Sequence, residues 1–310
     1  KLPTLYQCIP ISKIEGTDRL SNLGSEILLK MSRLLGEYKN KYSNEYINVL
    51  VQGDTATAYY TALAAFQSQC FVVHLEAGLR TYDMTNPYPE EFYRQCISKL
   101  ASYHLCPTQD NKYNIVSEMG EDNNKIIVGN TILDVLRKYD NPVTFDNSVV
   151  VTLHRRENQS NIAEWFKIID ELAEMFPQLQ FKFYAHLTPA VQSNLHLFKN
   201  VKIESSVSHE EIAKQIASCM FVITDSGGLQ EESSYYGKRC FVCRETTERK
   251  ESLGTTSFLA HSPKNLLELN DLMYRICNDQ QFREKKFECP YGDGYASEKI
   301  VAWFKKKRIL

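Results

Sequence analysis

Several features that define common protein classes are missing from this sequence. No apolar run reaches the ~18 residues of a membrane span, and no charged, apolar and small-residue leader is present. We therefore expect a soluble, cytoplasmic protein that is neither exported nor membrane-spanning. The formal net charge is only -2, which predicts no nucleic-acid binding. The basic cluster from Lys305 to Arg308 is interpreted as a solvated helix end.

Nucleotide-binding fingerprints and a disulfide pattern are missing as well. Neither G-x-G-x-x-G nor G-x-x-x-x-G-K-[ST] occurs, so nicotinamide and ATP chemistry are disfavoured and no cofactor is expected. The nine cysteines are odd in number and scattered, which indicates reduced thiols. The pair Cys240 and Cys243 has metal-ligand spacing, but it lies in a buried-strand pattern without a second pair, and we interpret it as core.

The chain is long enough for two domains, since it has 310 residues of which 43% are hydrophobic. Apolar runs that end in polar turns alternate with amphipathic segments, which predicts parallel sheets covered by helices. The predicted strands lie in INVLVQGDT, CFVVHLEAG, YHLCPT, KIIVGNT, SVVVTLHRRE, QFKFYAHLTP, NVKIESSV, CMFVITDSGG and KRCFVCRETTE. The predicted helices include 56–67, 91–101, 161–176 and 208–217. A polar segment, 137–148, is the predicted linker between two doubly wound α/β domains, 1–138 and 146–289.

Polar residues gather where the predicted strands end. Ligands bind outside the carboxyl ends of such sheets, because loops and helix N-termini meet there. Loops from both halves carry charged groups, so we expect a cleft between two domains. In TDSGGLQEE, the backbone around Ser226, Gly227 and Gly228 could cradle phosphate, and Glu232 could accept hydrogen bonds from a ribose. The alternative for this segment is an ordinary helix cap with a tight turn.

Two further loops carry cations suited to phosphate. In LHRRENQS, His154 and Arg155 follow a predicted strand, and guanidinium groups match phosphate oxygens in a fork geometry. In RETTER, Arg244 and Arg249 flank threonine hydroxyls that could bond a base or phosphate. The alternative for both loops is a set of surface ion pairs.

Carboxylates follow the strands of the first half. Asp54, Glu76, Glu90 and Glu91 lie at or just beyond predicted strand ends, and clustered acids can supply both an acid and a base. Asp54 taken alone is interpreted as a helix N-cap, and Asp83 as a turn cap. A divalent-metal site is an alternative reading of this cluster.

In combination, these segments resemble the non-hydrolysing UDP-N-acetylglucosamine 2-epimerases. The resemblance runs in order through QGDT, HLEAGLRT, NPYPEEFYR, VGNTILD, HRREN, HLTPAV, TDSGGLQEE, TTER and PYGDGYAS, from Gln52 to Ser297. It implies a glycosyltransferase-B fold with two Rossmann-like domains facing a cleft, and a C-terminal segment, 290–310, packing back on the first domain. It also implies a homodimer that serves synthesis of mannosamine-containing polysaccharide.

The resemblance further implies a reaction and its residues. UDP-N-acetylglucosamine and UDP-N-acetylmannosamine would be interconverted by loss of UDP to 2-acetamidoglucal and re-addition, with no metal. Asp54, Glu76 and Glu90 would act on the sugar and His154 would also contribute to catalysis. The UDP-binding set would be His154, Arg155, Ser226, Gly227, Gly228, Glu232, Arg244 and Arg249.

The sequence departs from the family pattern near its start. A GTRPE loop and a QH stretch of the family have no counterpart, so we expect one or two βα units of the first domain to be absent, with lower stability as the result. Two alternatives to the epimerase therefore stay open: an enzyme for another UDP-linked 2-acetamido sugar, and an inactive, truncated nucleotide-sugar binding protein. A glycosyltransferase would need an acceptor site, for which the sequence gives no indication.

Overall fold

The computed structural model describes residues 18–43, 45–121, 123–185 and 188–307. Packing divides the chain into two compact units: unit 1 comprises Lys1–Val128 and Ile300–Leu310, and unit 2 comprises Gly129–Lys299. His186 of the HLTPAV motif and Arg308 of the basic cluster lie outside the described residues. None of the helices within the described ranges is long and apolar enough to cross a membrane.

Unit 1 is built on a parallel four-stranded sheet in the order β1-β2-β3-β4. Its strands are β1 (Asn48–Gln52), β2 (Phe71–Leu75), β3 (Tyr103–Cys106) and β4 (Lys125–Ile127). Its helices are α1 (Arg19–Lys41), α2 (Ala56–Gln67), α3 (Glu90–Leu100) and α4 (Gln109–Met119), together with the end of α13 (Ala296–Lys307). This βα alternation confirms the predicted parallel α/β organisation.

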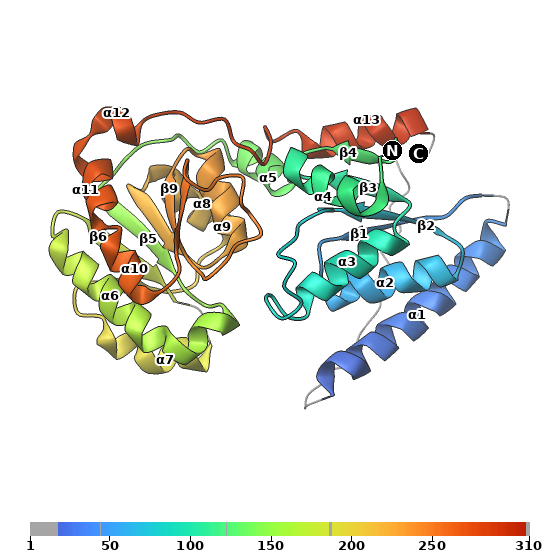
Figure 1. The fold of residues 1–310 in the computed structure, drawn as a ribbon, viewed down its shortest axis with the longest axis horizontal. Coiled ribbons are helices and arrows are strands. Elements are labelled where there is room, and N and C mark those ends of the chain that lie inside the picture. The colour runs from blue at the N-terminus through green and yellow to red at the C-terminus, as the bar shows by residue number, and fades with distance from the viewer. Residues whose placement is uncertain (1–17, 44, 122, 186–187, 308–310) are drawn as a thin grey trace. The chain divides into compact units, whose positions relative to one another are not determined.

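Helices cover both faces of this sheet (Figure 1). On one face, α1, α2 and α3 pack against alternate strand residues such as Val51 and Val72. On the other, Ile300 and Trp303 of α13 pack against Val73. Successive side chains of a strand point to opposite faces, so a strand covered on both sides needs a nearly continuous apolar run.

Unit 2 contains a parallel six-stranded sheet in the order β10-β9-β8-β5-β6-β7. Its strands are β5 (Ser148–Thr152), β6 (Gln180–Tyr184), β7 (Lys202–Glu204), β8 (Phe221–Thr224), β9 (Arg239–Cys243) and β10 (Ser257–Ala260). Its helices are α5 (Ile132–Tyr139), η1 (Arg156–Asn161), α6 (Ile162–Met175), α7 (Pro189–Asn194), η2 (Leu195–Leu197), α8 (His209–Ser218), α9 (Gly227–Tyr235), α10 (Pro263–Glu268), α11 (Asn270–Asn278), α12 (Gln280–Arg283) and the start of α13.

The core of unit 2 also lies on both faces of its sheet. Val149 and Val151 of β5 face an aromatic cluster that includes Trp165 and Phe166 of α6. Val150, between them, faces the opposite layer of α5 and α8. Cys240 and Cys243 of β9 are fully buried, which confirms their interpretation as core residues.

Strand β10 and the division between the units differ from what the sequence predicted. Strand β10 has no counterpart among the predicted strands, because its four residues, two of them only partly buried, give little pattern to detect. The division between the units falls after Val128, upstream of the predicted linker 137–148. The reason is that Leu133 and Leu136 of α5 are buried in the core of unit 2.

Candidate functional site

In unit 1, Asp54 lies in the turn between β1 and α2. The N-cap of α2 is Thr55, whose hydroxyl oxygen accepts a hydrogen bond from the Ala58 N–H at 3.3 Å. The interpretation of Asp54 as the N-cap is therefore wrong. Its carboxylate instead accepts a hydrogen bond from Arg94 Nε at 2.7 Å, across from α3.

Glu76 follows β2 in a left-handed backbone conformation, with φ of 65°. A non-glycine residue held there costs about 1–3 kcal/mol, and such residues concentrate at functional sites. A Cβ atom added to Gly53 would lie 3.5 Å from Glu76 Oε2, so the Glu76 carboxylate lies directly beside the β1–α2 turn. The two carboxylates Asp54 and Glu76 therefore border the same turn at the carboxyl edge of the sheet.

A buried histidine, His74, forms a hydrogen bond with the backbone of the β1–α2 turn. His74 Nε2 lies 2.9 Å from the Gly53 carbonyl oxygen, and Nδ1 is buried without a hydrogen-bond partner. Burial is the main cause that lowers the pKa of His74 to about 3, with smaller contributions from the charges of His104 and Arg80. The ring is therefore neutral near pH 7 and donates from Nε2 to the carbonyl oxygen.

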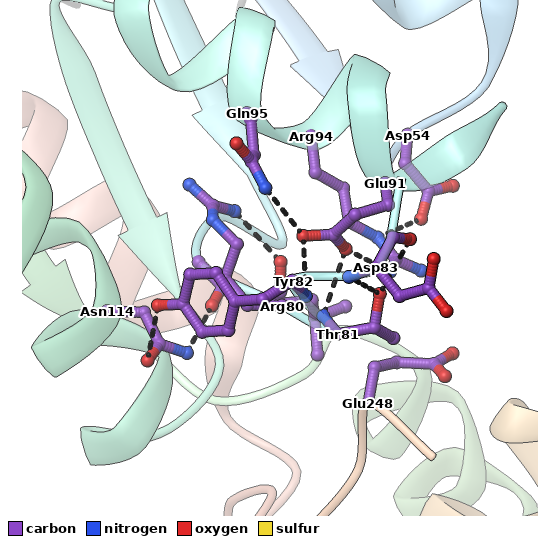
Figure 2. Close-up of polar contacts among 12 residues, drawn as sticks. Asp54, Arg80, Thr81, Tyr82, Asp83, Glu91, Arg94, Gln95, Asn114 and Glu248 are labelled. Carbon is purple, nitrogen blue, oxygen red and sulfur yellow. Dashed lines mark hydrogen bonds and ion pairs between the residues drawn. The ribbon is translucent and has the colours of Figure 1, made fainter. Parts of the chain in front are cut away.

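Glu91 is a fully buried carboxylate at the start of α3 (Figure 2). It accepts hydrogen bonds from the backbone N–H groups of Thr81 at 3.0 Å and Tyr82 at 3.1 Å, and from the side chains of Arg94 and Gln95. Burial raises its pKa, but the hydrogen bonds and the Arg94 charge outweigh this and leave the pKa below its usual value. Glu91 thus holds the loop after β2 in place.

Glu90, the predicted catalytic member of the PEE motif, is the first residue of α3 and is partly buried. Its neighbour Glu91 fixes the loop, so the two adjacent glutamates have different surroundings.

Asp83 accepts hydrogen bonds from the backbone and hydroxyl of Thr85, which confirms that it caps a turn.

Arg94 was not singled out by sequence reasoning, although it joins the acidic residues of unit 1. It pairs with Asp54 at 2.7 Å and with Glu91 at 3.1 Å, and its side chain is 5% exposed. The i, i+3 spacing of Glu91 and Arg94 on one helix was an available signal. The Asp54 contact spans 40 positions and gives no local signal.

In unit 2, Asp225 organises the loop that carries His154. This fully buried carboxylate accepts hydrogen bonds from the backbone N–H groups of His154 at 2.9 Å and Arg155 at 2.8 Å, and from the Asn158 amide at 3.1 Å. Its Oδ1 also lies 3.6 Å from His154 Nδ1, and the imidazole is 36% exposed. The imidazole is therefore accessible to a ligand, with a buried carboxylate beside it.

The turn Ser226–Gly228 forms the N-terminus of α9. Ser226 is the N-cap, and its hydroxyl oxygen accepts from the Leu229 N–H, so the cap that the sequence left as an alternative is present. A Cβ atom on Gly227 would lie 2.7 Å from Arg249 Nη1. The small residue at 227 therefore makes room for a buried guanidinium group, whereas a Cβ atom added to Gly228 would meet nothing closer than 3.9 Å.

Arg244 and Arg249, both predicted to bind UDP, have buried guanidinium groups that form ion pairs within unit 2. Arg244 pairs with Glu157 at 2.8 Å and Glu248 at 2.9 Å, while Arg249 pairs with Glu231 at 2.8 Å and also with Glu248. Buried cations need such partners to offset desolvation. These two residues therefore stabilise the loop after β9.

Glu232 on α9 is 4% exposed. Its Oε1 lies 3.3 Å from His209 Nε2, and its Oε2 is buried without a hydrogen-bond partner. Burial raises the pKa of Glu232, and the charge and hydrogen bond of His209 oppose this rise. His209 was not singled out by sequence reasoning. It lies on α8, 23 positions before Glu232, so no local pattern connects the two residues.

No group of three or more histidine, cysteine, aspartate and glutamate side chains in the described parts of the chain is arranged to hold a metal ion. Asp54 and Glu91 are instead paired with Arg94, and Glu91 also accepts a hydrogen bond from the loop backbone.

Two parallel α/β units, one with carboxylates at its strand ends and one with a small-residue turn at a helix N-terminus, define a nucleotide-sugar enzyme of the glycosyltransferase-B type. Residues 11–305 match the sequence pattern of the UDP-N-acetylglucosamine 2-epimerases, and the chain belongs to this family. The resemblance inferred from the sequence motifs is thereby confirmed.

Individual relatives agree with this assignment. The chain is 36% identical to the UDP-N-acetylglucosamine 2-epimerase of Campylobacter jejuni, over 91% of this chain and 79% of the relative. The crystal structure of the Neisseria meningitidis UDP-GlcNAc 2-epimerase bound to UDP-GlcNAc matches with a TM-score of 0.82 and 31% identity, covering 94% of this chain and 84% of that one. The S. aureus MnaA structure with UDP matches with a TM-score of 0.81 and 29% identity, covering 96% and 82%.

Proposed function

We propose that this protein is a UDP-N-acetylglucosamine 2-epimerase that interconverts UDP-GlcNAc and UDP-ManNAc. The observation that carries the proposal is the placement of Asp54 and Glu76 around one turn at the carboxyl edge of the unit 1 sheet. Family membership and similarity to a UDP-GlcNAc-bound relative supply the substrate class.

The proposed chemistry explains why several carboxylates are needed. The C2 proton of the sugar is not acidified by a carbonyl group, so its removal must accompany departure of UDP from C1. The C1–O bond breaks with its electron pair going to the diphosphate, a carboxylate takes the C2 proton, and a C1=C2 double bond forms in 2-acetamidoglucal. Return of a proton to the opposite face of C2, with attack of the diphosphate oxygen on C1, completes the epimerisation.

Asp54, Glu76 and Glu90 are the proposed proton-transfer residues. The ion pair of Asp54 with Arg94 at 2.7 Å supports a defined position for this carboxylate beside the β1–α2 turn. The strained backbone of Glu76 supports a functional role, since the surrounding structure must hold it there.

The proposed UDP-binding groups lie in unit 2. His154, with Asp225 behind it, is suited to stabilise charge that develops on the departing diphosphate. Arg155 and the backbone of Ser226, Gly227 and Gly228 at the N-terminus of α9 are proposed to bind the same group. Glu232 is the proposed ribose ligand. Exclusion of water during the reaction would keep the glucal intermediate from being lost.

We further propose a cytoplasmic homodimer that serves mannosamine-containing polysaccharide synthesis. The cysteines of the described residues are all free, which supports a reducing compartment. Light scattering of the purified protein tests the dimer.

Proton NMR of UDP-GlcNAc in deuterated water tests the reaction. We expect growth of the manno product together with loss of the C2 proton signal, because the proton returned to C2 comes from solvent. Glu76→Gln is the matched control and is expected to slow both changes. A spectrum that stays unchanged with a folded protein would contradict the proposal, and exchange at C2 of a different UDP-2-acetamido sugar would revise its substrate.

A further inference from the structure

A chain of polar contacts connects three helices of unit 2 behind the proposed ribose ligand. Tyr139 of α5 places its hydroxyl 3.1 Å from His209 Nδ1, and His209 Nε2 lies 3.3 Å from Glu232 Oε1. A phenol can donate or accept, so this chain persists whether the imidazole is neutral or protonated. The described contacts therefore hold one carboxylate oxygen of Glu232 and leave the other, Oε2, without a donor.

The position of this carboxylate connects it to the N-terminal turn of α9. A Cβ atom on Gly228 would lie 3.9 Å from both Glu232 Oε1 and Ser226 Oγ. His209 borders the carboxylate with a side chain that is 37% exposed, so the group lies close to solvent on that side. A buried carboxylate oxygen without a donor is costly, and a hydroxyl donor from a ligand would remove the cost.

We propose that His209 is a positioning residue for ribose recognition: it fixes Oε1 of Glu232 so that Oε2 accepts a hydrogen bond from a ribose hydroxyl of the uridine nucleotide. The inference rests on the proposed function and adds a residue that determines selectivity for ribonucleotides over deoxyribonucleotides. Because the ribose hydroxyl would bond a charged acceptor, discrimination of roughly tenfold or more is expected.

The same contacts predict a dependence on pH. Three titratable groups surround Glu232. His209 of α8 contacts it directly, Tyr139 of α5 contacts His209, and Tyr236 directly follows α9, the helix that carries Glu232. Burial raises the pKa of Glu232 and His209 lowers it, so loss of the histidine charge lets Glu232 take up a proton at higher pH. A protonated carboxyl is a weaker acceptor, and ribose discrimination should fade as pH falls.

Calorimetric titration of the full chain with UDP, 2′-deoxy-UDP and 3′-deoxy-UDP between about pH 5 and 8 tests this inference. The parent is expected to bind UDP at least about tenfold more tightly than one of the deoxy nucleotides. His209→Leu, which removes the donor, should reduce this ratio to below about threefold at every pH. His209→Gln keeps a neutral donor, so it should retain the parental ratio at pH 8. As the pH is lowered from 8, this variant should lose the ratio before the parent does.

Two further variants complete the design. Tyr139→Phe removes only the contact to Nδ1 and should reduce the ratio partly. His196→Gln, at an exposed histidine whose ring contacts the Ser193 carbonyl oxygen, should leave it unchanged. Equal ratios in the parent, His209→Leu and Tyr139→Phe would overturn the role of His209 while UDP binding persists. Absence of UDP binding by the folded parent would instead overturn the proposed function together with this inference.

Discussion

The two units fix their candidate loops in the same way but with different cations. In unit 1, buried Glu91 accepts from two successive backbone N–H groups, those of Thr81 and Tyr82. In unit 2, buried Asp225 accepts from those of His154 and Arg155. Each carboxylate also accepts from one side-chain amide.

The cation beside each carboxylate makes the difference. Glu91 is paired with Arg94, which stays charged at all accessible pH values, whereas Asp225 is paired with the titratable His154. Glu232 of unit 2 is likewise paired with a histidine, His209. Asp54 and Glu91 of unit 1 therefore lie beside a permanent charge, whereas Asp225 and Glu232 of unit 2 lie beside imidazoles.

The largest expected effect concerns the division of chemistry between the units. Asp54→Asn, Glu76→Gln and Glu90→Gln should each lower turnover by about 10²–10⁴-fold, because each removes a proposed acid or base, while UDP affinity stays near the parental value. His154→Ala should weaken UDP binding. Steady-state kinetics and calorimetry with UDP measure the two quantities.

Near-parental turnover in one of the three unit 1 variants would remove that residue from the catalytic set. Unchanged UDP affinity in His154→Ala would remove His154 from the nucleotide site. Either result would weaken the contrast between a catalytic unit and a nucleotide-binding unit.

A second expected difference is acid sensitivity. An unfolded histidine binds a proton below about pH 6.5, whereas folded His74 does so only near 3. Its contribution to stability is therefore complete above 6.5 and is lost as pH falls, by about 4 kcal/mol at pH 3. The lowered pKa of Glu91 means that its contribution to stability is likewise lost as pH falls. The raised pKa of Glu232 means that its contribution to stability grows as pH falls. We expect unit 1 to unfold at higher pH than unit 2.

The two tryptophans allow this prediction to be measured, because Trp303 lies in the core of unit 1 and Trp165 in that of unit 2. Trp165→Phe leaves a reporter for unit 1, and Trp303→Phe leaves one for unit 2. A glutamine at position 74 can still donate to the Gly53 carbonyl oxygen but does not titrate. Adding His74→Gln should therefore make the stability of unit 1 depend less on pH. Identical acid midpoints for both reporters would contradict the prediction.

The smallest expected effect compares the two buried carboxylates directly. Glu91→Gln should destabilise unit 1, and Asp225→Asn unit 2, by about 2–3 kcal/mol each, because charge-assisted hydrogen bonds are lost in the interior. Urea unfolding with the same tryptophan reporters measures both. Asp83→Asn, at an exposed carboxylate, is the control and should change stability much less. A Glu91→Gln effect as small as that of the control would disprove its role in holding the loop.

Local patterns predicted much of this protein. The boundaries of α2 agree with the predicted helix 56–67, because a polar turn and a cap precede an alanine-rich run. The strands with long apolar runs were predicted, whereas β10 was not. The candidate carboxylates were found because they follow strand ends, where parallel sheets place ligand-binding loops.

Contacts between distant residues could not be predicted. Arg244 and Arg249 have the residue type of a phosphate site, yet their guanidinium groups form ion pairs with glutamates from other segments, Glu157 and Glu231. Similarly, nothing near Asp54 in the sequence indicates its contact with Arg94, 40 positions away.

The parallel α/β class, the family and the positions of the acidic loops could all be predicted, because they depend on local periodicity and on motifs. Which acid faces its loop and which one supports it depends on the folded structure. Glu90 and Glu91 show this, since adjacent residues on a helix point in different directions and Glu91 alone is fully buried. Burial and partners from distant segments set the charge and role of each group, and these exist only once the chain has folded.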